Sequence, residues 1–369
     1  MPSPAGNDPM PPGRLRKTGP PCLVVLAAAA VLLIPAGMLA LGTSATLSPN
    51  AAFGKWTNVS SSAGTAPSPR QAFSMAFDAA LSATILFGGQ DTNGNALGDT
   101  WEFTHGQWSQ LTTRKAPSAR WGAGLVFDPN VNALILFGGR TGWYGVNPWQ
   151  ADTWEFTSQG WTQLQTSGQP EPQSARDLVW DGADGYVLLV GNNPRSPGVP
   201  SYWTFGSNTW TNITLKLATG LPSGVSWQSA VYDRRDGYVL FFGGGTPSCT
   251  GFGVTWAYVG GRFSNLTGSQ KLTPTAAMGS GAMDYDAAAA GVLMTGGYTS
   301  SCRPTGETWL FHNGLWSNIT RKVSGQIPGR WDARMVYDSS TNHDVTFGGN
   351  EARLGGYNYF IADTWTLRL

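Results

Sequence analysis

Short alternating and apolar stretches recur along most of the chain, and they predict strands rather than helices. In a typical stretch, residues 122–127 alternate small and large side chains and end at Asp128, and an apolar run begins five residues later at Ala133. Alternation with period two favours a half-buried strand, and a short apolar run bounded by turn residues favours a buried one. The acid between them predicts a tight hairpin turn, in which Asp accepts backbone hydrogen bonds.

This hairpin is repeated six times. The apolar run and the glycine pair that ends it occupy residues 85–89, 135–139, 187–192, 239–244, 292–297 and 345–349. The third copy keeps Gly191 and has Asn192 in place of the second glycine, and the six landmarks lie 50, 53, 52, 53 and 52 residues apart. The acids of the first turn are Asp78, Asp128, Asp181, Asp233, Asp286 and Asp338. A fixed period of this length is typical of a repeat architecture.

Each copy continues with a variable loop and two further strands that begin near large aromatic residues. The third strand contains Trp101, Trp154, Trp203, Trp256, Trp309 or Trp365, and the fourth begins at Trp108, Trp161, Trp210, Phe263 or Trp316. Four short strands in about 50 residues are the signature of a propeller blade.

The glycine pair followed by spaced aromatics resembles the kelch repeat, over residues 55–369. The resemblance implies an all-β fold, a six-bladed kelch-type β-propeller with four antiparallel strands per blade, and it says little about function. The last copy ends at Leu369 without a second aromatic, whereas Lys55–Val59 matches Thr209–Ile213. We therefore expect the N-terminal strand to pair with Asp363–Leu367, to close the last blade and to leave no open sheet edge.

The N-terminal region predicts a membrane segment. Residues 1–21 contain Arg14, Arg16 and Lys17, and residues 22–42 form a run without charge. Twenty helical residues span about 30 Å, the thickness of the hydrocarbon core. The basic flank is expected to stay in the cytoplasm, so that the propeller lies outside the cell after a linker at 43–54. The segment is a transmembrane signal anchor or a signal peptide cleaved near Ala45, which would make the protein secreted.

Charge and histidine content exclude several functions. The net charge is +1 and no Lys/Arg-rich block occurs beyond residue 17, so no nucleic-acid partner is expected. Some kelch propellers are copper-radical oxidases resembling galactose oxidase, but His105, His312 and His343 are the only histidines here and fall in separate hairpins. We expect no metal, cofactor or catalytic residue. An enzyme with an unrecognised site at the channel mouth, or a structural cell-envelope protein, is the alternative.

Three arginines recur with three carboxylates. Arg70, Arg120 and Arg330 lie eight residues before the turn acid in copies one, two and six, and the same copies have Asp99, Asp152 and Asp363 before the third strand. Because a bidentate pair satisfies both groups, we interpret them as structural ion pairs.

Cysteines and glycosylation motifs suggest two modifications. Cys249 and Cys302 each follow a glycine pair by five residues, which predicts a disulfide between neighbouring loops in an oxidising compartment. The alternative is two free thiols too far apart. Asn58, Asn212, Asn265 and Asn318 begin Asn-x-Ser/Thr motifs on the fourth strand. They are either glycosylated or chosen for the strand itself.

The loops after the glycines supply the candidate binding face. Two are long and aromatic, at 140–149 and 353–360. The candidate residues are Arg140, Trp143, Tyr144, Trp149, Arg195, Arg303, Arg353, Tyr357, Tyr359 and Phe360. Loops on a rigid scaffold often carry function, and Trp, Tyr and Arg anchor interfaces. The alternative is that these aromatics fold back onto the blades. The sequence thus predicts a noncatalytic binding or adhesion module for a protein or glycan ligand.

Overall fold

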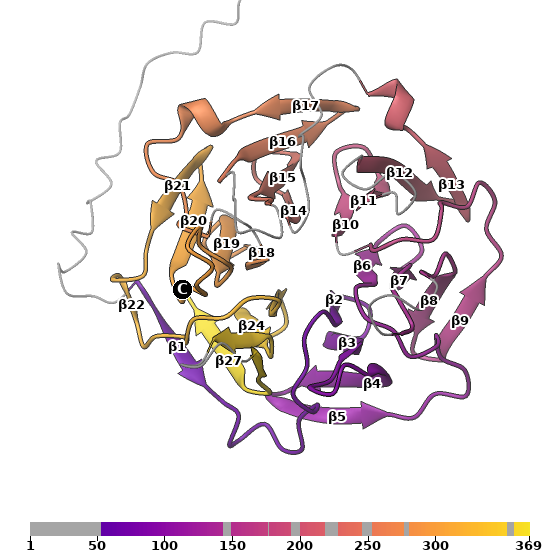
Figure 1. The fold of residues 1–369 in the computed structure, drawn as a ribbon, viewed down its shortest axis with the longest axis horizontal. Coiled ribbons are helices and arrows are strands. Elements are labelled where there is room, and N and C mark those ends of the chain that lie inside the picture. Colours follow the sequence, from indigo (N-terminus) through magenta and orange to yellow (C-terminus); the bar gives the residue numbers. More distant parts are fainter. Residues whose placement is uncertain are drawn as a thin grey trace, which may run out of the picture. The chain divides into compact units, whose positions relative to one another are not determined.

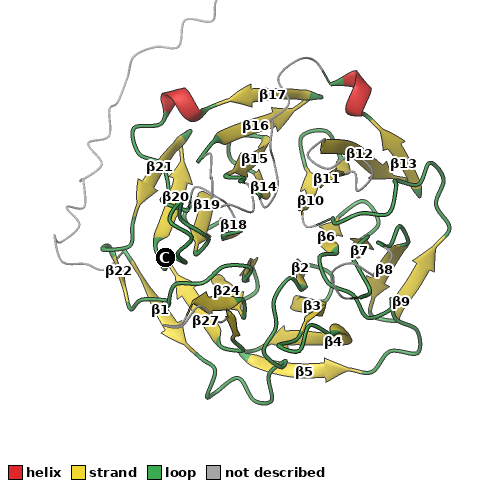
Figure 2. Ribbon diagram, viewed as in Figure 1, coloured by secondary structure: helices red, strands yellow, loops and turns green. Residues whose placement is uncertain are grey.

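The protein is a six-bladed all-β propeller (Figures 1 and 2). The computed structural model describes residues 53–142, 149–175, 177–192, 200–217, 228–245, 253–276, 280–352 and 358–369. The predicted membrane segment at 22–42 lies outside these residues. Among the residues that are described, no helix is long and apolar enough to cross a membrane.

Every blade is a sheet of four antiparallel strands, numbered from the channel outward. Blade one consists of β2 (Ser74–Asp78), β3 (Ala83–Gln90), β4 (Ala96–Thr104) and β5 (Gln107–Leu111). Blade two consists of β6 (Gly124–Asp128), β7 (Ala133–Phe137), β8 (Thr153–Thr157) and β9 (Gly160–Leu164). Blade three consists of β10 (Asp177–Asp181), β11 (Tyr186–Asn192), β12 (Pro200–Gly206) and β13 (Thr209–Asn212).

The second half of the ring follows the same plan. Blade four consists of β14 (Ser229–Asp233), β15 (Tyr238–Phe242), β16 (Thr255–Val259) and β17 (Arg262–Asn265). Blade five consists of β18 (Ala282–Asp286), β19 (Gly291–Thr295), β20 (Thr308–His312) and β21 (Leu315–Asn318). Blade six consists of β23 (Arg334–Asp338), β24 (His343–Phe347), β27 (Thr364–Arg368) and β1 (Gly54–Asn58).

The N-terminal strand closes the ring as predicted. β1 pairs antiparallel with β27, with Trp56 opposite Leu367 and Asn58 opposite Trp365. One feature was not predicted: β22 (Val323–Ser324) adds a short parallel fifth strand outside β1. Strand β1 therefore lies between β22 and β27, two strands of the C-terminal half of the chain, and is not a free sheet edge.

The six turn acids fold the first hairpin of each blade. Asp78 Oδ1 accepts hydrogen bonds from the backbone N–H groups of Ala80 and Leu81, at 2.9 and 3.1 Å. Asp181, Asp233, Asp286 and Asp338 make the same contacts. The predicted role of the repeated acid is confirmed. These turns define the hairpin face of the ring, and the connections after the glycines emerge on the opposite, loop face.

The fourth-strand aromatics join neighbouring blades. The indole N–H of Trp161 in blade two donates to Thr100 Oγ1 in blade one at 2.9 Å. Equivalent bonds join Trp210 to Thr153, Trp316 to Thr255, Trp56 to Thr308 and Trp108 to Thr364. A buried indole needs such a partner, and the threonine at the start of each third strand provides it.

One junction between blades lacks the tryptophan–threonine hydrogen bond. Between blades three and four the threonine is replaced by Tyr202, and the tryptophan by Phe263, which has no N–H. Their rings pack with centroids 5.2 Å apart. The two substitutions occur together: Phe263 has no N–H that needs the threonine Oγ1 acceptor of the other junctions, and its ring packs on Tyr202 instead.

Two loop-face connections form strands that the sequence did not predict. In blade one, β3 and β4 continue beyond the glycine pair through a register shift between Phe87 and Gly89, so the connection is a tight hairpin. In blade six, β25 (Asn350–Ala352) and β26 (Asn358–Phe360) make a two-stranded ribbon. Short 3-10 helices, η1 (Thr214–Lys216) and η2 (Thr267–Ser269), follow the outer strands of blades three and four.

Candidate functional site

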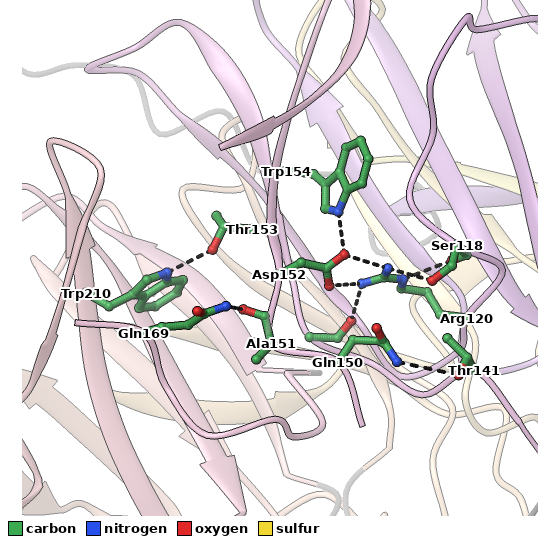
Figure 3. A network of polar contacts seen from close by, with 11 residues as sticks. Ser118, Arg120, Thr141, Gln150, Ala151, Asp152, Thr153, Trp154, Gln169 and Trp210 are labelled. Carbon is green, nitrogen blue, oxygen red and sulfur yellow. Dashed lines mark hydrogen bonds and ion pairs between the residues drawn. The ribbon is translucent and has the colours of Figure 1, made fainter. Parts of the chain in front are cut away.

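The three predicted ion pairs are present and lie on the loop face. Arg120 is 1% exposed and binds Asp152 through two parallel bonds, Nη1 to Oδ1 at 2.6 Å and Nη2 to Oδ2 at 2.9 Å (Figure 3). Arg70 binds Asp99 and Arg330 binds Asp363 in the same way. These are bidentate pairs of the strong, charge-assisted kind. The interpretation of the repeated arginines as structural is confirmed.

Each pair is part of a larger unit that includes the third-strand tryptophan. The Trp154 indole N–H donates to Asp152 Oδ2 at 2.7 Å (Figure 3), and Trp101 and Trp365 donate to Asp99 and Asp363 at 2.6 Å. Burial alone acts to raise the pKa of Asp152, but the hydrogen bonds and charge of Arg120 hold it below its usual value. The carboxylate is therefore charged at neutral pH and fixes both partners.

The glycine pair is the other half of this unit. Arg70 Nη1 donates to the carbonyl of Gly88, the first glycine, at 3.0 Å, and the N–H of Gly89 donates to the Arg120 carbonyl of the next blade at 2.9 Å. Gly88 has a φ of 65°, and a Cβ there would lie 2.5 Å from the Arg120 carbonyl oxygen. Only glycine fits such an approach between blades.

Next to these units on the loop face lies a repeated pair of residues, which is largely buried: Asn350 is 0%, Gln90 6% and Trp331 7% exposed. The residue after the repeated arginine and the residue after the glycine pair exchange both backbone hydrogen bonds, in Gln71–Gln90, Trp121–Arg140 and Trp331–Asn350. Because the buried arginine holds one partner and the glycine pair holds the other, these side chains are placed by the most rigid part of each blade. Adjacent blades six, one and two therefore present a row of three such pairs.

In blade two the row carries an arginine between two indoles. Arg140 Cζ lies 5.6 Å from the centroid of the Trp121 ring and 5.4 Å from that of Trp149. The centroids of the Trp121 and Trp149 rings are 6.3 Å apart. The Trp121 and Arg140 side chains are largely buried, since each residue is only 9% exposed. Such cation–π contacts stabilise both the guanidinium and the ring orientations.

Amides and a second aromatic pair extend the row across blades one, six and five. Asn350 Nδ2 donates to Gln71 Oε1 at 3.2 Å, and Gln71 Nε2 donates to Gln90 Oε1 at 3.1 Å. Tyr298 stacks on Trp331 with ring centroids 4.2 Å apart. Burial, together with the charge of Asp332, raises the pKa of Tyr298 to about 12, so its hydroxyl stays protonated. We name this set Gln71, Gln90, Trp121, Arg140, Trp149, Tyr298, Trp331 and Asn350 the mouth row.

The structure places half of the predicted loop residues. Arg140 and Trp149 belong to the mouth row, Arg303 is exposed on the blade-five loop, and Tyr359 is 45% exposed. Phe360 is only 8% exposed and packs onto the blade instead of facing solvent. Trp143, Tyr144, Arg195, Arg353 and Tyr357 lie outside the described residues. Six residues of the mouth row were not predicted, although each directly follows a repeated arginine or a glycine pair: Gln71, Gln90, Trp121, Tyr298, Trp331 and Asn350.

A cavity of about 600 Å³ occupies the central channel and extends to the hairpin face. Its wall includes one aromatic residue from each blade, directly before the turn acid: Phe77, Phe127, Trp180, Tyr232, Tyr285 and Tyr337. Arg234 and Asp284 also line it. The Asp284 oxygens accept backbone N–H bonds from Tyr285 and Tyr337 at 2.8 and 2.7 Å, but burial dominates and raises the pKa of Asp284 to about 6.

Comparison with known proteins agrees with this architecture. The KLHDC2/KLHL20/DRC7 Kelch-repeats domain family matches residues 45–246. The chain belongs to the kelch-repeat family. The solved "Structure of YjhT" is similar, with a TM-score of 0.57 and 13% identity over 82% of this chain and 96% of that chain, which shows the fold alone. No curated protein matched the chain.

As a kelch propeller, the chain has the fold of a general interaction or binding module. Its histidines do not meet: His105 contacts Thr104, His312 contacts Arg235, and His343 contacts Thr341. Across the described part of the chain, no group of three His, Cys, Asp or Glu side chains is arranged to hold a metal ion. Cys302 is disulfide-bonded, but its predicted partner Cys249 lies outside the described residues, so that pairing stays a prediction.

The four Asn-x-Ser/Thr motifs have a structural role in this kelch propeller. Each Asn is exposed and its Oδ1 accepts the backbone N–H two residues on, as Asn318 does from Thr320 at 3.0 Å. The hydroxyl of the third residue then accepts a backbone N–H of the neighbouring strand, as Thr320 does from Thr308 at 2.9 Å. The motif thus ends the outer strand, and glycosylation stays a prediction.

Proposed function

We propose that this kelch propeller is a noncatalytic recognition module that binds a protein or glycan ligand at the mouth row. The observation that carries the proposal is the row itself, in which aromatic, amide and guanidinium groups from four adjacent blades lie side by side, and those of blades six, one and two lie next to arginine–carboxylate pairs. Preorganised side chains lose little entropy on binding, and aromatic rings beside amides suit both sugar rings and peptide segments.

The same proposal places the propeller outside the cell. It is tethered by residues 22–42, or secreted after cleavage near Ala45, since the basic flank at Arg14, Arg16 and Lys17 precedes an uncharged run. A ligand at the cell surface or in the cell envelope fits this placement.

Arrays of glycans and of cell-surface proteins test the site. The purified protein is compared with a Trp149→Ala/Tyr298→Ala variant, and Val131→Ala serves as the control because Val131 is 48% exposed in a turn on the hairpin face. We expect the double variant to lose at least about tenfold in affinity, since two aromatic anchors are removed. The control should bind like the wild type. Full binding by the double variant would reject the mouth row.

A second candidate is a small-molecule site in the channel, which the aromatic-lined cavity favours. Its volume of about 600 Å³ lies within the range of ligand pockets, and Asp284 and Arg234 are polar groups in its wall. Soaking crystals with a fragment library distinguishes the two sites. Density in the channel that Asp284→Asn removes, with array binding unchanged, would favour the channel, whereas an empty channel would reject it.

A further inference from the structure

The wall of the central channel carries one carboxylate in otherwise apolar surroundings. Each blade contributes the three residues before its turn acid, which form three layers along the cavity. The aromatic ring is the layer nearest the hairpin face, and the third layer consists of Met, Leu and Ala. The layer between them contains Ala76, Val126, Val179, Val231, Asp284 and Val336. Asp284 is the only acid among the described residues of the wall.

The propeller does not need an acid at this position. Four other blades have valine there and one has alanine, and their first two strands pair in the same register as those of blade five. Asp284 accepts backbone N–H bonds from Tyr285 and Tyr337, but in the described part of the chain no basic side chain forms an ion pair with it. Because an unpaired carboxylate in an apolar wall is costly, its presence points to a counter-ion that a ligand supplies.

An arginine stands at the hairpin-face entrance of the same channel. Arg234 directly follows the turn acid Asp233, lines the cavity and is exposed, and it forms no ion pair with a described residue. Burial raises the pKa of Asp284, and the charge of Arg234 acts against that rise, so the two groups face the same space. The aromatic ring lies between them, with Tyr232 and Tyr285 from the same two blades.

The hairpin half of the channel therefore presents one charge of each sign. The other arginine of the wall, Arg334, begins β23 at the loop-face end, where its Nε donates to the Phe73 carbonyl at 3.4 Å. A simple cation entering from the hairpin face would be repelled by Arg234, and a simple anion by Asp284. A molecule that carries both charges would pair with both groups.

We propose that the channel binds a small zwitterion, with its organic ammonium group inside the aromatic ring against Asp284 and its acidic group at Arg234. The inference rests on the channel site, the second candidate function, and is independent of the mouth row. Ammonium groups are attracted to the faces of Trp and Tyr rings, which Trp180, Tyr232 and Tyr285 supply here. Arginine in turn pairs with a carboxylate through charge-assisted hydrogen bonds. The cavity of about 600 Å³ has room for such a molecule.

Calorimetric titration of the purified full chain tests the ligand class. The probe is γ-butyrobetaine, which joins a trimethylammonium group to a carboxylate, and the titration is carried out at pH 7.5, where Asp284, with a pKa of about 6, is charged. Two isosteres remove one charge each: tert-butyl replaces the trimethylammonium group, or isopropyl replaces the carboxylate. We expect the tert-butyl isostere to bind at least about tenfold and the isopropyl isostere at least about threefold more weakly than γ-butyrobetaine, because the ammonium group contacts both Asp284 and the ring.

Variants of the two charged residues separate the two contacts. Asp284→Val introduces the residue of four other blades, and Asp284→Asn keeps an oxygen that can accept the Tyr337 N–H. Both should weaken γ-butyrobetaine at least about tenfold without weakening the tert-butyl isostere. Arg234→Met should weaken γ-butyrobetaine at least about threefold without weakening the isopropyl isostere. Arg235→Met is the matched control and should bind like the wild type, since Arg235 is exposed beside Arg234 but does not line the cavity.

Three results would overturn the zwitterion: equal affinities for γ-butyrobetaine and its tert-butyl isostere, unchanged affinity in Asp284→Val, or no binding of γ-butyrobetaine at millimolar concentration. The fragment soak then shows which proposal has failed. Fragments bound in the channel without an ammonium group would leave the channel site standing, whereas an empty channel would reject the site as well. Array binding tests the mouth row separately.

Discussion

Blades six, one and two differ from blades three, four and five at equivalent positions. In the first group a buried arginine holds a carboxylate, the carboxylate holds the third-strand indole, and the mouth row lies above. In blades three and four, Ser201 and Val254 stand where the carboxylate would be, and Trp203 and Trp256 are only half-buried. The same repeat therefore closes the ring with either arrangement, and in blades six, one and two the ion pair lies next to the bridged residues of the mouth row.

Blade five is intermediate between the two groups. Glu307 accepts the Trp309 indole N–H at 2.9 Å and the Thr275 hydroxyl at 2.5 Å, without an arginine among its described partners. The indole contact therefore persists when the ion pair is absent. The arginine is therefore not required for the indole contact. Its additional role is to hold the glycine pair, because its Nη1 donates to the carbonyl of the first glycine, as Arg70 does to Gly88.

The largest effect is expected from removing one buried guanidinium. Arg120→Met should lower the free energy of unfolding by about 2–3 kcal/mol, because it leaves the half-buried Asp152 carboxylate without its counter-ion. Arg235→Met is the control, since Arg235 is exposed and its nearest carboxylate atom, in Asp236, is 4.0 Å away; it should change stability by less than about 0.5 kcal/mol. Chemical denaturation measures both. Equal stabilities for the two variants would show that the ion pairs do not distinguish the two groups of blades.

The seam between blades five and six, where the two groups meet, should respond to pH. Asp344 is fully buried, and in the described part of the chain its carboxyl group has no hydrogen-bond partner other than the neighbouring Asp286 carboxyl. Burial, followed by the charges of Asp286 and Asp284, raises the pKa of Asp344 well above its usual value. The equivalent residues in blades three to five are Val187, Val239 and Val292.

The sign of the pH effect follows from proton binding. A carboxyl whose pKa rises from about 3.9 in the unfolded chain binds more protons when folded, so its contribution favours folding at acid pH and is lost as pH rises through the folded pKa. The melting temperature should therefore fall between pH 5 and 7.5. Asp344→Val should flatten this fall and add about 1–3 kcal/mol at pH 7.5, because a buried unsatisfied group is removed. Parallel pH profiles for wild type and Asp344→Val would contradict this account.

The smallest effect is expected in blade five. Glu307→Gln should change stability by less than about 0.5 kcal/mol, since the amide oxygen can still accept the Trp309 indole bond. Asp99→Asn in blade one, the matched change, should lower it by about 2 kcal/mol, because Arg70 loses its counter-ion. Thermal melting of the two variants side by side measures the difference. A loss for Glu307→Gln as large as that for Asp99→Asn would place blade five in the ion-paired group.

Much of the fold could be predicted because each blade repeats its own local rules. The turn acids, the glycine pairs and the match between Lys55–Val59 and Thr209–Ile213 predicted the hairpins, the blade number and the closing strand. The arginine–carboxylate pairs could be predicted because both members are absent together in copies three and four. The ribbon of β25 and β26 and the strand β22 could not, since their pairing depends on neighbours brought together by ring closure.

The candidate site was predicted less well than the fold. Trp121 and Trp331 were missed because a residue beside a repeated arginine has no periodic signal of its own, and its place in the mouth row depends on a bridge to the residue after the glycines. Phe360 was expected on the surface, but it is buried because the β25–β26 ribbon turns it toward the blade.

The repeated unit could be recognised from the residues alone, because alternation, turn acids and glycine pairs act within one hairpin at a time. How neighbouring units pack against each other became visible only in the folded ring. The joint change of Thr and Trp to Tyr202 and Phe263 makes sense only when neighbouring blades are placed side by side. Contacts between units far apart along the chain leave no local pattern, so only the closed ring reveals them.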